Sequence, residues 1–251
     1  MSTLHRFSRT EILIGPEGLN KLGNSSVILF GLGGVGSFAA EALCRAGVGR
    51  ITIVDFDDVC VSNINRQLHA LDDTVGRPKT QIMAERMRLI NPAAEIIPYR
   101  EFYSAESAEL LLAGHQDYVL DAIDHFTSKV HLIRSCRERG IPIISSMGAA
   151  MKRDPTLIRV ADISQTSKCR MARSVRKLLR KEGIESGVTV VYSTEEFPGF
   201  PMTAEQAETI ITLPREQGEW RRRVVLGSIS YIPALFGLTM AGLVVNALID
   251  R

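Results

Sequence analysis

Short apolar runs alternate with longer amphipathic segments along residues 27–145. The apolar runs lie near residues 27–31, 50–55, 95–99, 117–121 and 141–145, and each has the length and composition of a buried strand. Helical periodicity covers residues 35–46, 79–90, 105–113 and 128–139. Regular alternation of this kind is typical of right-handed βαβ units. We therefore predict an α/β fold with a Rossmann-like, doubly wound, mostly parallel sheet.

The pattern changes after residue 150. A turn at Arg153–Pro155 is followed by a basic helical segment, Lys168–Lys181, and then by a proline-containing stretch without sustained periodicity. We predict that this stretch, at about residues 193–223, is a mobile loop. Residues 1–150 would form the core, and residues 151–251 would be a C-terminal extension of the same domain.

The last long apolar segment, Ile229–Ile249, is about 20 residues long and carries no charge, which is enough to cross a membrane. Pro233, Asn246, several small residues and the lack of a flanking aromatic belt argue against a membrane span. The alternative is a buried helix that packs on the sheet or at a dimer interface. We favour the buried helix and expect no membrane association.

Composition allows a substantial core, because 45% of the 251 residues are hydrophobic and 23% are charged. The net charge of +2 is too small to indicate a nucleic-acid binder. Positive charge is nevertheless concentrated in one acid-free segment, at Lys168, Arg170, Arg173, Arg176, Lys177, Arg180 and Lys181, with a second cluster at Arg221–Arg223. Such a segment is either a solvated helix face or a surface that contacts phosphates.

The four cysteines, Cys44, Cys60, Cys136 and Cys169, are scattered without a C-x-x-C pair. This spacing argues against a structural zinc site and fits a reducing cytoplasm. Cys44 and Cys136 fall within predicted helices, so we expect both near the core. The cations next to Cys169 would favour its thiolate, but we favour a non-catalytic role for it.

A glycine-rich turn, GLGGVGS, joins the first predicted strand to the first predicted helix. Gly31 permits a tight turn, Gly33 and Gly34 let backbone N–H groups approach an anion, and Gly36 allows close helix packing. The helix start then offers unpaired donors to a phosphate. Asp55 ends the next strand about 20 residues further on, where a carboxylate can bind ribose hydroxyls. These features fit NAD as well as ATP.

The segment after this acid separates the two nucleotides. Adenylyl transfer spreads negative charge over the phosphates and needs cations aimed at them, whereas a nicotinamide site needs only modest charge. Arg66 and Lys79 can supply that charge, and Asn63 can donate a hydrogen bond to a phosphate oxygen. Asp124 follows an apolar strand at the ligand crevice, where a carboxylate can hold Mg²⁺. With Asp57, this ordered set favours ATP as the cofactor.

The ordered motifs resemble the ubiquitin-activating-type ATP-binding family, which includes the ThiF proteins and the molybdopterin-synthase adenylyltransferases. The resemblance covers about residues 4–150 and rests on RFSR, GLGGVGS, VDFDDVCVSNINRQ, VGRPK, INP and DAID. The later segments ISSMGAA, ADISQTSKC, VVYSTEE and GSISYIPALFGLTMAG are most similar to the tRNA threonylcarbamoyladenosine dehydratases, so the resemblance extends over nearly the whole chain.

The resemblance implies a role for each matching residue. The nucleotide cradle would comprise Gly31, Gly33 and Gly36, with Asp55 on the ribose. Contacts to the triphosphate would come from Asn63, Arg66 and Lys79.

The same resemblance implies a catalytic set, further ligands and partners. Asp124 would carry Mg²⁺ and act with Arg66 and Lys79 as a catalytic residue, whereas Asp121 would be structural. Arg9 matches a family arginine that reaches the γ-phosphate in the neighbouring subunit, which implies a homodimer. A monovalent cation and a sulfur-transfer protein are further candidate ligands and partners.

The function implied is ATP-dependent dehydration of threonylcarbamoyladenosine in tRNA, in which a carboxylate is adenylated and a ring then closes. The alternative is an adenylyltransferase that activates the C-terminal glycine of a ubiquitin-like sulfur carrier. That activity would be signalled by a C-x-x-C pair or a catalytic cysteine loop, and the pairs are absent from this sequence. A nucleotide-binding module without catalysis is a third, less favoured interpretation.

Overall fold

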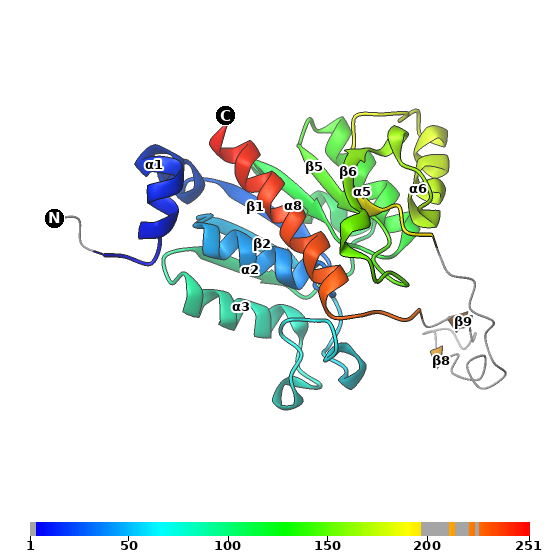
Figure 1. Cartoon of the computed structure of the whole chain (residues 1–251), viewed down its shortest axis with the longest axis horizontal. Helices are drawn as coiled ribbons and strands as arrows, with labels where there is room; N and C mark the ends of the chain where they lie inside the picture. The colour runs from blue at the N-terminus through cyan, green and yellow to red at the C-terminus, as the bar shows by residue number, and fades with distance from the viewer. Residues whose placement is uncertain (1–3, 197–210, 214–220, 224–225) are drawn as a thin grey trace.

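The computed structural model describes residues 4–196, 211–213, 221–223 and 226–251 (Figure 1). Its centre is a seven-stranded sheet with the strand order β3-β2-β1-β4-β5-β7-β6, in which only β6 runs antiparallel to its neighbour. The strands are β1 (Ser26–Phe30), β2 (Arg50–Val54), β3 (Glu95–Tyr99), β4 (Tyr118–Asp121), β5 (Ile143–Ser146), β6 (Ile158–Asp162) and β7 (Thr189–Ser193). The predicted α/β fold is confirmed.

Successive side chains of each strand point to opposite sides of the sheet, so the apolar strands form two apolar faces. Helices cover both of these faces. Val27 and Leu29 of β1 belong to one apolar cluster, and Ile28 and Phe30 belong to the other. The first cluster is closed by α1 (Ser8–Gly23), α2 (Gly36–Ala46), α3 (Lys79–Ile90) and α8 (Tyr231–Ile249). The second is closed by α4 (Ala105–Leu111), α5 (Phe126–Glu138) and α6 (Arg170–Lys181).

Among the described residues, single-turn 3₁₀ helices lie in the connections at η1 (Val61–Asn63), η2 (Asp72–Thr74), η3 (Pro155–Leu157) and η4 (Ile163–Gln165). Three larger elements were not predicted from the sequence, namely α1, β6 and β7. Helix α1 was not predicted because Gly15, at φ 73°, and Pro16 interrupt its helical periodicity. Strand β6 is a half-exposed edge strand without the continuous apolar run of the central strands.

Two boundaries in the C-terminal extension differ from the sequence expectation. The basic helix α6 begins at Arg170 and not at Lys168, because Lys168 has a positive φ of 60° and Cys169 caps the helix. The predicted mobile loop at 193–223 falls mostly outside the described residues. Within it, Ser193 ends β7, and β8 (Ile211–Leu213) pairs antiparallel with β9 (Arg221–Arg223).

The apolar helix α8 crosses α2 in close contact (Figure 1). A Cβ added at Gly237 would lie 2.2 Å from the carbonyl oxygen of Val35, so only glycine allows this approach. Among the described residues α8 is long and apolar enough to span a membrane, with a mean hydropathy of 2.0, but half of it is buried inside the protein. Its buried side packs on α2 and the sheet, as the buried-helix interpretation requires.

Candidate functional site

The candidate site lies where the strand order reverses, between β1 and β4. In doubly wound sheets the crevice at the carboxyl ends of such strands is the usual ligand site. The backbones that leave the two strands touch here, since a Cβ added at Gly31 would lie 2.8 Å from the carbonyl oxygen of Ala122. Gly31 also has a φ of +89°, which side chains rarely adopt.

The glycine turn presents unused backbone donors. Within the described part of the chain, the N–H groups of Gly33, Gly34 and Val35 have no hydrogen-bond acceptor. A Cβ at Gly33 would meet open space, whereas one at Gly36 would lie 1.7 Å from the carbonyl oxygen of Gly31. Consecutive free N–H groups at the start of α2 form a concave site suited to a phosphate.

Asp55 is buried directly beneath this turn, with 8% of its surface exposed. Its carboxylate accepts a hydrogen bond from the Leu32 N–H at 2.6 Å and another from the Asp57 N–H at 2.8 Å. Burial raises the pKa of Asp55 above its usual range, and the nearby Lys79 ammonium partly opposes that rise. The carboxylate is thus fixed in orientation at the carboxyl end of β2.

Lys79 is the first residue of α3 and is buried, with 4% of its surface exposed. Its ammonium donates to Asp57 at 2.7 Å and lies 3.9 Å from Asp55. The Asp57 side chain is 48% exposed, so water can solvate this partner if the lysine turns toward an anion. Lys79, Asp57 and Asp55 therefore form one charged group beside the glycine turn.

Arg66 and Asn63 approach the turn from the segment after β2. A Cβ at Gly34 would lie 3.3 Å from Cγ of Arg66, and the Arg66 N–H donates to the Asn63 carbonyl oxygen at 3.0 Å. The Arg66 guanidinium donates to the Ser62 carbonyl oxygen at 2.7 Å and to Asn65 Oδ1 at 2.9 Å, and the described residues include no carboxylate paired with it. Its charge is available to a ligand.

Asp124 lies on the exposed loop after β4 and forms no ion pair among the described residues.

A buried network around Asp121 holds this loop, and the sequence did not predict it. Asp121 is completely buried and accepts from the Lys129 ammonium at 2.7 Å and the Ser145 hydroxyl at 2.6 Å. Its other oxygen accepts from the Ile123 N–H at 3.0 Å, which pins the loop backbone. The structural role expected for Asp121 agrees with this burial.

Nothing in the sequence beyond its spacing from Asp121 indicated that Lys129 is buried, because a lysine in a helical pattern usually faces solvent.

Two further buried polar groups, on His69 and Gln67, were also not predicted from the sequence. His69 is 2% exposed, and neither of its ring nitrogens has a hydrogen-bond partner among the described residues, as is also true of Gln67 Oε1. Burial and then the charge of Lys79 lower the pKa of His69 to about 4. This histidine is therefore neutral at physiological pH.

Arg9 lies apart from the predicted site residues at the glycine turn within a single chain. It lies in α1, where a Cβ added at Gly47 would lie 3.7 Å from Phe7. Gly47 caps the carboxyl end of α2, whereas the glycine turn lies at its amino end. The length of α2 is roughly 16 Å, at about 1.5 Å per residue, so Arg9 does not reach the turn of its own chain.

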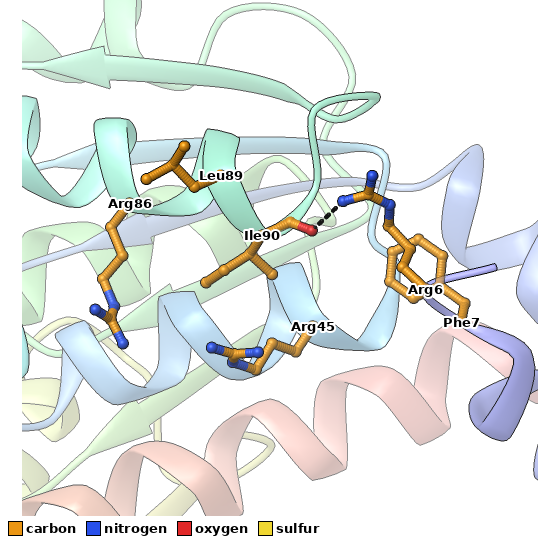
Figure 2. A pocket seen from close by; sticks show the side chains of 6 residues that line it. All are labelled: Arg6, Phe7, Arg45, Arg86, Leu89 and Ile90. Atoms are coloured by element: carbon orange, nitrogen blue, oxygen red, sulfur yellow. Dashed lines mark hydrogen bonds between the residues drawn. The ribbon is translucent and has the colours of Figure 1, made fainter.

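A hollow of about 420 Å³ lies at this same distal end and contains none of the predicted nucleotide residues (Figure 2). It is lined by Arg6, Phe7, Arg45, Arg86, Leu89 and Ile90. Figure 2 shows Arg6 donating to the Ile90 carbonyl oxygen, at 2.5 Å. Glu41 pairs with both Arg45 and Arg86, and Arg6 donates to a backbone carbonyl oxygen, so each of the three guanidinium groups of this hollow already has a partner within the chain. We therefore assign no nucleotide to it.

Three of the four cysteines are buried and one, Cys60, is exposed. Cys44 and Cys136 are fully buried, as expected, and burial raises their pKa values to about 11 and about 12. Cys169 is 6% exposed, and its sulfur accepts from the Ala172 N–H at the start of α6. Such a buried cap agrees with a structural role. Cys60 is exposed, and the hydrogen bond from the Ser62 hydroxyl lowers its pKa.

Comparison with known proteins decides the family. The ThiF family model matches residues 7–251. The chain belongs to the ThiF family. It is 47% identical to the tRNA threonylcarbamoyladenosine dehydratase of Bacillus subtilis over 98% of this chain and 95% of that protein. By contrast, the molybdopterin-synthase adenylyltransferase of Salmonella typhimurium is 34% identical over only 65% of this chain and 66% of that protein.

Solved structures agree with this ThiF-family membership. The tRNA N6-threonylcarbamoyladenosine dehydratase of Escherichia coli in complex with ATP has a TM-score of 0.84 and 34% identity, over 98% of this chain and 94% of that one. The same Escherichia coli protein in complex with AMP has a TM-score of 0.86. The similarity includes residues 151–251 as well as residues 1–150.

Proposed function

We propose that this chain is an ATP-dependent enzyme that dehydrates threonylcarbamoyladenosine in tRNA. One observation carries the proposal: the 47% identity to the Bacillus subtilis dehydratase spans 98% of the chain. The match to a sulfur-carrier-type adenylyltransferase stops at 65%. Because the extension after residue 150 is shared with the dehydratases, it favours their substrate over a ubiquitin-like protein.

The residues at the sheet edge fit a nucleoside triphosphate. Three free N–H groups at the start of α2 would bind phosphate oxygens, and the fixed carboxylate of Asp55 would accept from the ribose hydroxyls. Arg66 and Lys79 would bind the rest of the triphosphate, with Asn63 as a neutral donor. Lys79 would exchange its bond to the exposed Asp57 for one to a phosphate oxygen.

The carboxylate of the threonylcarbamoyl group must be activated first, because its oxygen is a poor leaving group. The free carboxylate of the threonylcarbamoyl group attacks the α-phosphorus of ATP, the bond to the β-phosphate oxygen breaks, and pyrophosphate leaves. A nucleophile of the same side chain then attacks the activated carbonyl carbon and gives up its proton, a ring closes, and AMP leaves with the former carboxylate oxygen. The net change is loss of one water from the nucleoside. Placement of both groups on one side chain makes closure effectively unimolecular.

Positive charge near the phosphates would come from two side chains and a metal ion. Arg66 and Lys79 stabilise the charge that develops on the phosphates as pyrophosphate departs. Asp124 would hold Mg²⁺, which would supply positive charge to offset the negative charge of the triphosphate. The described residues include no cluster of three or more metal-binding side chains, so Asp124 would be the main protein group that holds the ion.

We extend the proposal to assembly and location. Arg9 cannot reach the glycine turn of its own chain, so its proposed contact with a γ-phosphate requires a second subunit and hence a homodimer. A sulfur-transfer protein is a further proposed partner, and the enzyme would work in the cytoplasm.

The decisive experiment follows the nucleoside. The protein is incubated with ATP, Mg²⁺ and tRNA that carries threonylcarbamoyladenosine, and the digested nucleosides are analysed by mass spectrometry. We expect loss of one water with release of pyrophosphate and AMP. Release of pyrophosphate only when a sulfur-carrier protein replaces tRNA would support the alternative adenylyltransferase. ATP binding without pyrophosphate release from either substrate would reduce the chain to a binding module.

A further inference from the structure

Helix α6 has opposite faces of different chemistry. Ala172, Val175 and Leu179 are buried against the second apolar cluster. The exposed cations Arg173, Lys177, Arg180 and Lys181 follow the spacing i, i+4, i+7 and i+8, which places them on one stripe of the helix. We call these four residues the basic stripe. It is opposite the buried face, since the two sets differ by about half a turn at 3.6 residues per turn.

The structure sorts six of the seven cations that the sequence groups together. Arg176 is half-buried and donates to the Thr166 carbonyl oxygen at 3.0 Å and to the Ile163 carbonyl oxygen at 3.2 Å, so it holds α6 against η4. Lys168 pairs with Glu196 at 3.0 Å. Within the described part of the chain, the basic stripe has no salt bridge, and the nearby Glu182 is paired with Arg134 at 2.8 Å.

Unpaired charges of one sign repel each other, so a stripe of this kind is stabilised by a polyanion. Arg173 and Lys177 are about 6 Å apart along the helix axis, and Arg180 lies about 5 Å further on, at about 1.5 Å per residue. The stripe therefore presents a line of positive charge and not a single anion pocket. A line of charge matches a nucleic-acid backbone, in which phosphates repeat along a strand.

The position of α6 links this stripe to the candidate site. Met171, in the first turn of α6, packs on the loop after β5, since a Cβ added at Gly148 would lie 3.5 Å from the Met171 Cβ. Strand β5 is the direct neighbour of β4, so its carboxyl end opens at the same edge of the sheet as the glycine turn. The basic stripe begins at that edge and leads away from it.

We propose that the basic stripe of α6 binds the phosphate backbone of the tRNA and so delivers the modified nucleoside to the crevice between β1 and β4. This inference rests on the proposed function for the identity of the RNA. It assigns the stripe to tRNA binding and the cations of the glycine-turn region to the nucleotide. Loss of the stripe should therefore raise the KM for tRNA while kcat at saturating tRNA stays near the parent value.

The test compares three variants that each remove positive charge. Arg173→Gln with Lys177→Gln removes two members of the stripe. Arg176→Gln removes a charge from the same helix, but one that is bound to carbonyl oxygens. Arg50→Gln with Arg139→Gln removes two exposed charges elsewhere, where each pairs with a glutamate. Binding of tRNA carrying threonylcarbamoyladenosine is measured across a salt series of about 50 to 200 mM.

We expect the stripe variant to bind tRNA about ten-fold or more weakly at about 0.1 M salt, and the slope of log K against log salt to fall by about one unit per lost contact. Affinity for ATP should not change. Arg176→Gln should lower the melting temperature with little change in the salt slope, and the Arg50 and Arg139 variant should match the parent.

Three results would overturn the proposal. They are a parent-like slope and affinity in the stripe variant, an equal loss in the Arg50 and Arg139 variant, or a fall in ATP affinity that accompanies the loss of tRNA binding. Failure of the proposed function looks different, because the parent protein itself would then fail to remove water from the modified tRNA.

Discussion

Two lysine–aspartate pairs lie at the same edge of the sheet and differ in burial. Lys129 and Asp121 are both 0% exposed, 2.7 Å apart, and the ammonium also donates to Ser145 Oγ at 3.1 Å and to the Ser146 carbonyl oxygen at 3.0 Å. Lys79 and Asp57 are also 2.7 Å apart, but the aspartate side chain is 48% exposed. The first ammonium has all three donors in use. The second makes one short bond.

The difference teaches how one pair of residue types serves two purposes. A buried, fully hydrogen-bonded pair cannot release its lysine without leaving an uncompensated charge, so it fixes the loop that carries Asp124. A pair with one exposed member can open, because water solvates the carboxylate that is left. Of these two pairs, we therefore propose the Lys79 pair as the one that exchanges its partner for a phosphate.

The largest effect is expected from the buried pair. Lys129→Met leaves the Asp121 carboxylate buried without its counter-ion, so the free energy of unfolding should fall by about 3 to 5 kcal/mol. Denaturant unfolding of the purified protein measures the change. The double variant Lys129→Met with Asp121→Asn removes the stranded charge and should recover part of the loss. A single variant as stable as the parent would show that this pair does not hold the fold.

The pair with the exposed aspartate, Lys79 and Asp57, should show the opposite balance between stability and rate. Lys79→Ala and Arg66→Ala should each slow pyrophosphate release by about 10²-fold or more, because each removes a cation from the developing phosphate charge. The loss of unfolding free energy should stay well below that of Lys129→Met. Release kinetics and denaturant unfolding are measured on the same preparations. Turnover near the parent value in both variants would remove these residues from the adenylylation step.

The third prediction concerns His69, which is buried and has no hydrogen-bond or ion-pair partner within the described part of the chain. Its pKa is lowered to about 4 in the folded protein, from 6.5 in the unfolded chain. Below pH 6.5 the unfolded chain takes up a proton that the folded protein refuses, so stability is lost as the pH falls from 6.5 toward 4.

Between about pH 7 and pH 5 this loss should be about 2 kcal/mol of unfolding free energy. His69→Phe removes the titrating group and should reduce the difference between the two pH values by that amount, as measured by denaturant unfolding at each pH. An unchanged difference would mean that other groups cause the acid sensitivity. Lys79→Ala sharpens the comparison, since removal of the nearby charge should raise the pKa of His69.

The central strands and helices were predicted from the sequence within about two residues, which is usual accuracy for strongly periodic elements. Periodicity failed where a backbone break or an exposed edge weakened the signal, as in α1 and β6. Among the candidate site residues, the structure gathers Asp55, Lys79 and Arg66 around the glycine turn. It leaves Arg9 at the far end of α2, and it adds Lys129 beneath the DAID loop.

The sequence by itself determined the βαβ alternation, the strand-to-helix glycine turn and the acid at the end of β2, because these depend on neighbours a few residues apart. Only the tertiary structure decided which lysine is locked and which can open, which cations of α6 face solvent, and that α8 packs on α2. Those outcomes depend on residues far apart in the chain, such as Gly237 against Val35. Hydrophobicity alone cannot choose such partners, because every apolar face gains by burial and only the topology determines where each face is buried.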